Sequence, residues 1–116
     1  MTPEELLNKQ VQEFNKGNIR FLMTLYENEA CFSPRTGEVV RDLDSIRRSL
    51  QDVIDKGAKL EAKVKRVIQT SDLALMITEW SISGVEPKLS GRGTVVLRQQ
   101  PDDKWLIVLE NPWGTE

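Results

Sequence analysis

The segment Leu60-Glu61-Ala62-Lys63-Val64-Lys65 alternates apolar and charged side chains residue by residue. This period of two is typical of a β-strand with one buried and one solvent-facing side. It begins shortly after Gly57, where the helical spacing of apolar residues stops. Three further strand patterns follow, separated by short turn sequences. The four predicted strands form an antiparallel meander over residues 59–70, 73–83, 90–100 and 104–111.

Three helices are predicted ahead of these strands. The first begins at Thr2-Pro3-Glu4-Glu5, where Thr2 caps the helix, proline suits the first helical position and Glu5 completes a capping box. Gly17 ends this helix and Gly57 ends the third. The predicted helices span residues 3–15, 18–26 and 42–56, and a short strand is predicted at 30–32. Helices followed by an antiparallel meander indicate an α+β fold.

The composition is that of a globular chain, which we expect to form a single domain over residues 1–116. Apolar residues make up 39% of the sequence, charged residues make up 29%, and the net charge is −2. Because no basic stripe and no run of about 20 apolar residues occurs, we expect neither nucleic acid nor a membrane as partner. The acidic start lacks the pattern of a signal peptide, and one cysteine permits no internal disulfide. We therefore expect a cytoplasmic protein.

The sequence contains no histidine. This absence excludes Ser-His-Asp and Cys-His catalysis and zinc sites built on imidazole. Acid–base chemistry is left to carboxylates, lysines, Tyr26 and Cys31. The acidic pairs are too ordinary to indicate a metal site, so we expect no metal and no cofactor.

Two of the predicted strands are apolar on both faces. Leu73-Ala74-Leu75-Met76-Ile77 and Trp105-Leu106-Ile107-Val108-Leu109 show no alternation with polar residues. In an antiparallel sheet this pattern requires both faces to be covered. Three helices cover only one face, so we expect a homodimer through the outer face of the sheet.

Three segments carry a resemblance to a known family. They are Leu25-Tyr26-Glu27-Asn28-Glu29-Ala30-Cys31-Phe32-Ser33-Pro34-Arg35-Thr36-Gly37, the strand from Asp72 and Ala74 to Trp80, and the final stretch 105–114. Their order and spacing resemble SnoaL-like and ketosteroid-isomerase-like proteins of the nuclear-transport-factor-2-like superfamily, in particular its small bacterial branch. The resemblance implies a cystatin-like, cone-shaped fold in which a curved antiparallel sheet wraps around the helices. It also implies a pocket in the cone and frequent dimers.

The resemblance argues against steroid isomerisation and leaves one acid in place. In ketosteroid isomerases the base is an aspartate just before the turn proline, and this chain has Ser33 there. The oxyanion-donating tyrosine of those enzymes corresponds to a position near Gln10. Polyketide cyclases of this fold place an acid on the last strand, where Glu110 stands. We expect Glu110 to share a face with Leu106 and Val108.

Six residues are candidates for a site in the cone. Glu110 is the candidate acid–base, and Tyr26, placed on the apolar face of the second helix, is the candidate hydrogen-bond donor. The candidate ligand-binding residues are Trp80, Trp113, Arg66 and Arg92. Each has a structural alternative: a paired carboxylate at the rim, a core tyrosine, tryptophans in packing, or surface arginines.

Three functions remain open at this point. The first is a dimeric domain that binds a small, partly apolar molecule. The second is an isomerase, cyclase or hydratase that uses Glu110 and Tyr26, and the third is a module for protein association. An apolar cavity with a convergent acid favours the enzyme, a cavity without an acid favours the binding domain, and a filled cone favours the association module.

Overall fold

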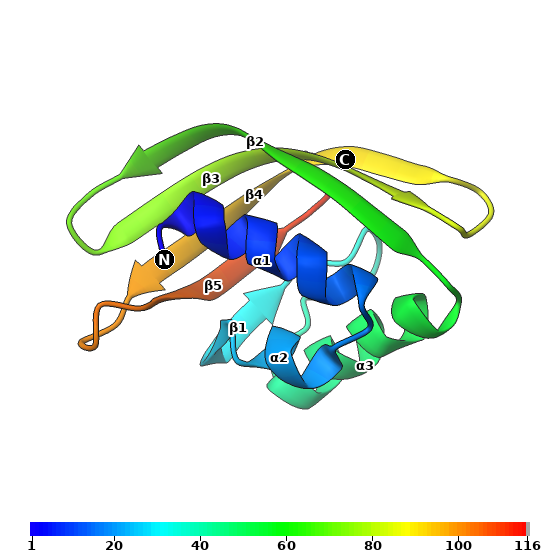
Figure 1. Cartoon of the computed structure of the whole chain (residues 1–116), viewed down its shortest axis with the longest axis horizontal. Helices are drawn as coiled ribbons and strands as arrows, with labels where there is room; N and C mark the ends of the chain where they lie inside the picture. Colours follow the sequence, from blue (N-terminus) through cyan, green and yellow to red (C-terminus); the bar gives the residue numbers. More distant parts are fainter. Residues whose placement is uncertain (116) are drawn as a thin grey trace.

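The computed structural model describes residues 1–115 and shows a curved five-stranded sheet whose concave face receives the first helix (Figure 1). The strand order in the sheet is β1-β5-β4-β3-β2. The elements are α1 (Pro3–Asn15), α2 (Ile19–Met23), β1 (Tyr26–Phe32), α3 (Leu43–Asp55), β2 (Lys59–Gln69), β3 (Leu73–Ser83), β4 (Leu89–Gln99) and β5 (Trp105–Asn111).

The predicted α+β class, the curved sheet and the four long strands are confirmed. The second helix is the exception, because it ends at Met23 and Tyr26 is the first residue of β1. The expected short strand at 30–32 is the end of this longer strand. It adds a fifth strand to the meander, paired in parallel with β5, so that Tyr26 lies beside Ile107 and Phe32 beside Glu110.

The start of α1 is the capping box that the sequence predicts. Thr2 Oγ1 accepts from the backbone N–H of Glu5 at 3.2 Å, and the backbone N–H of Thr2 donates to Glu5 Oε1 at 2.8 Å. This cap fixes the rotation of the helix and therefore which residues face the sheet. The buried stripe of α1 includes Leu6, Leu7, Gln10 and Phe14, so one amide side chain lies among apolar ones.

Two β-bulges change which residues face the concave side. In β2, Val64 pairs with Thr78 but Arg66 already pairs with Ile77, so Lys65 is an extra residue. A single extra residue reverses the alternation of the strand beyond it. Arg66 is therefore on the convex face with Ile77, and the sequence alternation that suggested otherwise does not continue through the bulge.

The second bulge lies in β5. Leu97 pairs with Ile107 and Val96 pairs with Leu109, so Val108 is the extra residue. Glu110 then pairs with Val95, whose side chain is buried on the concave side. The expectation that Glu110 shares a face with Leu106 and Val108 is wrong, because the bulge places it on the face of Ile107 instead.

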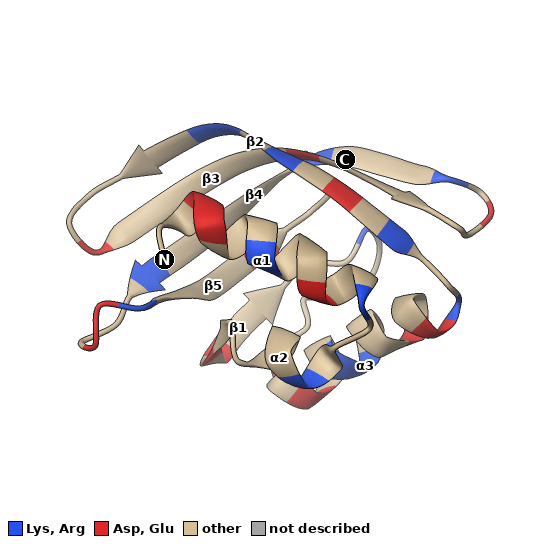
Figure 2. Cartoon of the chain, in the orientation of Figure 1, with Lys and Arg blue, Asp and Glu red and all other residues tan. Residues whose placement is uncertain are grey.

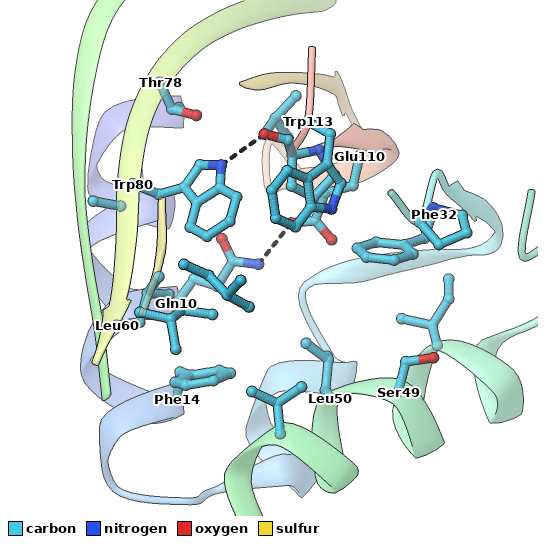
Figure 3. Close-up of a pocket in the computed structure, with 18 of the residues that line it drawn as sticks. Gln10, Phe14, Phe32, Ser49, Leu50, Leu60, Thr78, Trp80, Glu110 and Trp113 are labelled. Atoms are coloured by element: carbon cyan, nitrogen blue, oxygen red, sulfur yellow. Dashed lines mark hydrogen bonds between the residues drawn. The ribbon is translucent and has the colours of Figure 1, made fainter. Parts of the chain in front are cut away.

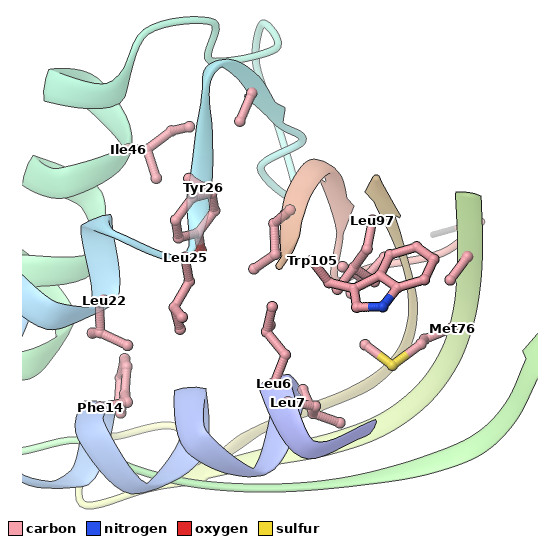
Figure 4. Close-up of a cluster of buried hydrophobic side chains, with 14 of the residues drawn as sticks. Leu6, Leu7, Phe14, Leu22, Leu25, Tyr26, Ile46, Met76, Leu97 and Trp105 are labelled. Atoms are coloured by element: carbon pink, nitrogen blue, oxygen red, sulfur yellow. The ribbon is translucent and has the colours of Figure 1, made fainter. Parts of the chain in front are cut away.

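The core fills the space between the helices and the concave face of the sheet (Figure 4). Leu6 and Leu7 reach from α1 toward the sheet, and Tyr26 points from β1 into the same space. The largest fully buried side chains are Leu6, Leu22, Ile46, Met76, Leu97 and Ile107. Trp105 is also buried, as its place in the last strand predicts.

The convex face of the sheet has no covering element within residues 1–115. Along β3 the side chains alternate between the two faces of the sheet: Ala74 and Met76 are buried on the concave face, whereas Leu75 and Ile77 are half-buried on the convex face. Leu109, Ile68 and Leu73 expose 48%, 53% and 39% of their surface. In Figure 2 charges recur along β2, while β3, β4 and β5 are mostly uncharged.

Among residues 1–115, no helix combines the length and the apolar character that crossing a bilayer requires.

Candidate functional site

A cavity of about 390 Å³ lies between the concave face of the sheet, α1 and α3 (Figure 3). Most of its wall is aliphatic or aromatic. Its polar or ionisable side chains, apart from the two indoles, are Gln10, Arg35, Ser49, Thr78 and Glu110. Such a cavity, apolar with a few converging polar groups, is the usual form of a small-molecule site.

Three side chains from three elements form a closed hydrogen-bonded group, of which Gln10 and Glu110 line the cavity and Tyr26 lies behind them. The Tyr26 hydroxyl donates to Glu110 Oε1 at 2.6 Å. Gln10 Nε2 donates to Glu110 Oε2 at 3.0 Å and to the Tyr26 hydroxyl oxygen at 3.2 Å. The parallel pairing of β1 with β5 brings Tyr26 beside the acid, and the capped α1 supplies the amide.

Burial of Glu110 favours its neutral form, whereas the hydrogen bonds that it accepts favour its ionised form. Burial raises the pKa of this carboxyl above its ordinary value of 4.5, although the hydrogen bonds from Tyr26 and Gln10 oppose that rise. Burial, the adjacent charge of Glu110 and the hydrogen bond to it raise the pKa of Tyr26 well above 10.0. Tyr26 therefore keeps its proton and serves as a donor to Glu110 at neutral pH.

Two tryptophans, Trp80 on β3 and Trp113 in the segment after β5, form one part of the cavity wall. Their rings meet edge to face, with centroids 4.9 Å apart and planes at 85°. Trp80 Nε1 donates to the carbonyl oxygen of Pro112 at 2.6 Å, which ties β3 to the segment after β5. This segment crosses the sheet closely above Gly93, where an added Cβ would lie 2.7 Å from the backbone of Asn111 and Pro112. Glycine at 93 therefore lets Trp113 reach the cavity.

Arg35 lies at the outer rim of the cavity. It is exposed, and its Cζ is 4.7 Å from the centroid of the Trp113 ring. This contact is a cation–π interaction. It places a positive charge beside the opening, on the wall formed by Trp113.

The candidates from the sequence divide into three groups. Glu110, Trp80 and Trp113 line the cavity, as expected. Tyr26 is buried behind Glu110 and reaches the cavity only through it. The expectation that Arg66 or Arg92 faces the cone is wrong, since both pair with residues on the convex side.

The convex placement of the two arginines has different causes. Arg66 is moved there by the bulge at Lys65. Arg92 pairs with Glu79 across β3 and β4, and its guanidinium lies 3.6 Å from Glu79 Oε1 with 82% of the side chain exposed. Neither guanidinium is therefore available to an anion in the cone or to Glu110.

Several cavity residues were not singled out by the sequence as members of a site: Gln10, Arg35, Ser49 and Thr78. Gln10 has a readable signal, because it is a polar residue on the stripe that contains Leu7 and Phe14. Arg35 and Ser49 carry no such signal, since they reach the cavity only through the packing of α3 and the preceding loop against the sheet. Within residues 1–115, no three acidic or cysteine side chains gather as a metal site.

Fold and cavity together define a domain of the nuclear-transport-factor-2-like type. The model of the SnoaL-like domain family matches residues 4–110, and the chain belongs to this family. None of the curated proteins matches the sequence significantly.

Solved structures share the fold at low sequence identity. An NTF-2 like protein of unknown function from Shewanella oneidensis MR-1 has a TM-score of 0.79 at 17% identity, with 91% of each chain covered. A putative calcium/calmodulin-dependent protein kinase type II association domain from Thiobacillus denitrificans has a TM-score of 0.82 at 14% identity, covering 99% of this chain and 96% of that one. A ketosteroid isomerase-like protein from Erwinia carotovora atroseptica has a TM-score of 0.71 at 13% identity, covering 92% and 88%. At such identities the similarity concerns the fold alone.

Proposed function

We propose that this chain is a binding domain that holds one small, largely apolar molecule in the cavity. The observation that carries the proposal is the cavity itself, which has about 390 Å³ of space behind an almost entirely apolar wall. Protein interiors are otherwise close-packed, and unfilled apolar space lowers stability. A domain that served only for association gains nothing from such a space, so the third function open to the sequence ranks last.

An enzyme of the isomerase, cyclase or hydratase type is the second candidate. The observation that favours it is Glu110, a carboxyl in an apolar cavity with a raised pKa. Such chemistry also needs a donor for the oxygen of the substrate. The Tyr26 hydroxyl has one proton, and it is directed at Glu110. Tyr26 and Glu110 are thus hydrogen-bonded to each other, and no Tyr26 proton is left for the substrate. For this reason we rank the enzyme below the binding domain.

We further propose that the domain is a homodimer through the convex face of the sheet. The support comes from adjacent apolar side chains on β2, β3, β4 and β5 that no element within residues 1–115 covers. Soluble monomers rarely expose contiguous apolar patches of more than a few hundred Å². A two-fold axis through this face covers it with an identical copy of itself.

The binding proposal is tested with a neutral apolar fluorophore, N-phenyl-1-naphthylamine. We expect saturable binding of one molecule per chain, with quenching of Trp80 and Trp113. Ala62 lines the cavity from β2, so Ala62→Val and Ala62→Phe fill it in two steps. Affinity should fall in that order while the circular dichroism spectrum is kept. Absence of saturable binding, or equal affinity in all three proteins, would contradict the proposal.

The enzyme candidate has a separate test. A base in the cavity should exchange protons next to the carbonyl of 2-octanone or 2-tetralone for solvent deuterium, followed by NMR. Catalysis predicts that exchange occurs and is lost in Glu110→Gln but kept in Arg35→Met. No exchange above the rate without protein would leave binding as the function.

A further inference from the structure

We propose that the inner wall of the cavity selects an apolar molecule whose polar group is a hydroxyl, and that this hydroxyl donates its one hydrogen bond to Gln10 Oε1 or to a carboxylate oxygen of Glu110. This inference rests on the proposed binding function and names the class of ligand. It follows from counting which donors and acceptors of the wall already have partners within residues 1–115.

The donors of the hydrogen-bonded group are all in use. The Tyr26 hydroxyl proton goes to Glu110 Oε1. Gln10 Nε2 has two protons and two acceptors, Glu110 Oε2 and the Tyr26 oxygen. The group therefore offers no N–H or O–H to a ligand while the carboxyl is ionised.

The other polar side chains along β3 and α3 are likewise committed. Thr78 Oγ1 donates to the carbonyl of Gly93 at 3.4 Å, and Ser49 Oγ donates to the carbonyl of Ser45 at 3.0 Å. Trp80 Nε1 donates to Pro112. Within residues 1–115, the side-chain donors of the wall without a partner are those of Arg35 and Trp113, which stack on each other at the rim.

Acceptors, by contrast, remain free at the inner wall. The Gln10 amide turns its nitrogen to Glu110, so its oxygen lies on the side of Trp80 (Figure 3). Each carboxylate oxygen of Glu110 accepts one hydrogen bond from the protein, and a carboxylate oxygen has lone pairs for two. A ligand that brings only acceptors, such as a ketone or an ether, leaves the Gln10 oxygen without a donor in an apolar space and adds nothing to the single hydrogen bond that each Glu110 oxygen accepts.

A hydroxyl fits this wall better than an ammonium group. The apolar lining that raises the pKa of Glu110 also penalises the transfer of a cation from water. A buried ion pair often fails to recover that desolvation penalty. An alcohol or phenol supplies the missing donor without bringing a charge.

Matched probes on two carbon frames test the inference by isothermal titration calorimetry at pH 8. The first set is 1-octanol, methyl octyl ether, 2-octanone and octylamine, and the second is 2-naphthol with 2-methoxynaphthalene. Because an ether leaves the acceptor at the inner wall unpaired, we expect each alcohol to bind with an affinity higher than that of its ether by a factor of about 10 or more. Equal affinities of alcohol and ether would overturn the inference, and so would octylamine binding more tightly than 1-octanol.

Two variants test which residue causes the preference for alcohols over ethers. Glu110→Gln brings an N–H donor to the wall, so it should reduce the preference for alcohols to below about threefold and improve the binding of 2-octanone. A gain for the ketone cannot arise from misfolding. Arg35→Met removes one of the two donors at the rim, and whatever it does to overall affinity, it should leave the ratio of alcohol affinity to ether affinity unchanged. If Arg35→Met abolishes the preference instead, the inference fails while the proposed binding function stands. If no probe binds, both the inference and the binding function fail.

Discussion

The Tyr26 hydroxyl donates a 2.6 Å hydrogen bond to Glu110 across the parallel pair of β1 and β5, joining residues 84 positions apart in the sequence. This bond makes β1, an edge strand of the sheet, part of the site. It opposes the rise that burial causes in the pKa of Glu110.

Tyr26→Phe should raise the pKa of Glu110 further, because it removes a hydrogen bond that favours the ionised carboxyl. The unfolding free energy should fall by about 1.5–3 kcal/mol, the usual contribution of a hydrogen bond to a charged group. Carboxyl carbon NMR shifts followed against pH measure the first effect and urea titration the second. In the Glu110→Gln background the loss of stability should shrink, and an equal loss there would show that the phenol acts by packing alone.

Stability should depend on pH through Glu110 with a defined sign. Its folded-state pKa is raised, so between the ordinary value of 4.5 and the folded value the native state holds a proton that the unfolded state releases. The unfolding free energy therefore falls as the pH rises through this window and is constant above it.

The comparison that isolates this effect is the difference in unfolding free energy between the wild type and Glu110→Gln, measured in urea from pH 4 to pH 8. The other carboxylates cancel in the difference. A difference that increases with pH would mean that the folded protein lowers the pKa of Glu110, contrary to the effect of its burial.

Gly93→Ala should destabilise the fold and detach the segment that carries Trp113. Alanine ordinarily suits a strand better than glycine by about 0.5–1 kcal/mol. Here, however, its Cβ would lie 2.7 Å from the backbone of Asn111 and Pro112. Backbone atoms, unlike a flexible side chain, cannot relieve this clash by changing rotamer. Overpacking of this kind lowers stability by about 1–3 kcal/mol. Ser90→Ala, an exposed position on the same strand, is the control for urea titration and tryptophan fluorescence. A variant as stable as wild type would show that the segment moves aside freely.

The sequence predicts the elements of this fold well because their signals are local. The capping box at Thr2 and Glu5 and the change of apolar period after Gly57 act within a few residues. The capping box places the helix from 3 to 15, and the apolar run that follows the turn at Ser71-Asp72 places the strand from 73 to 83, both at the bounds that the structure has.

The sequence predicts the site only in part, because register and bulges depend on contacts between distant strands. The bulge at Lys65 sends Arg66 to the convex face, and the bulge at Val108 turns Glu110 toward the cavity. Neither bulge is marked by a glycine or a proline in the sequence. The family resemblance therefore identifies Glu110, whereas the strand alternation assigns it the wrong neighbours on its face. Gln10 carries a readable signal, because it is a polar residue on the apolar stripe of α1.

The homodimer proposed through the convex face leads to the last prediction. Ile77 pairs with Thr94 and Arg66 in the middle of that face, so Ile77→Glu places a charge at the centre of the proposed interface. A standard interface buries about 800 Å² per chain, and a desolvated unpaired charge opposes its formation. Size exclusion coupled to light scattering should show twice 13.3 kDa for the wild type and 13.3 kDa for the variant.

Ser90→Glu adds the same charge at the polar end of the same face, where Ser81 pairs with Ser90, and it should remain dimeric. The concave cavity lies on the other side of the sheet, so the monomeric variant should still bind N-phenyl-1-naphthylamine if it stays folded. A wild-type mass of 13.3 kDa at micromolar concentration would contradict the dimer. A dimeric Ile77→Glu variant would place the interface elsewhere, leaving Leu75, Ile77, Val96 and Leu109 as an uncovered patch of a size that soluble chains rarely keep.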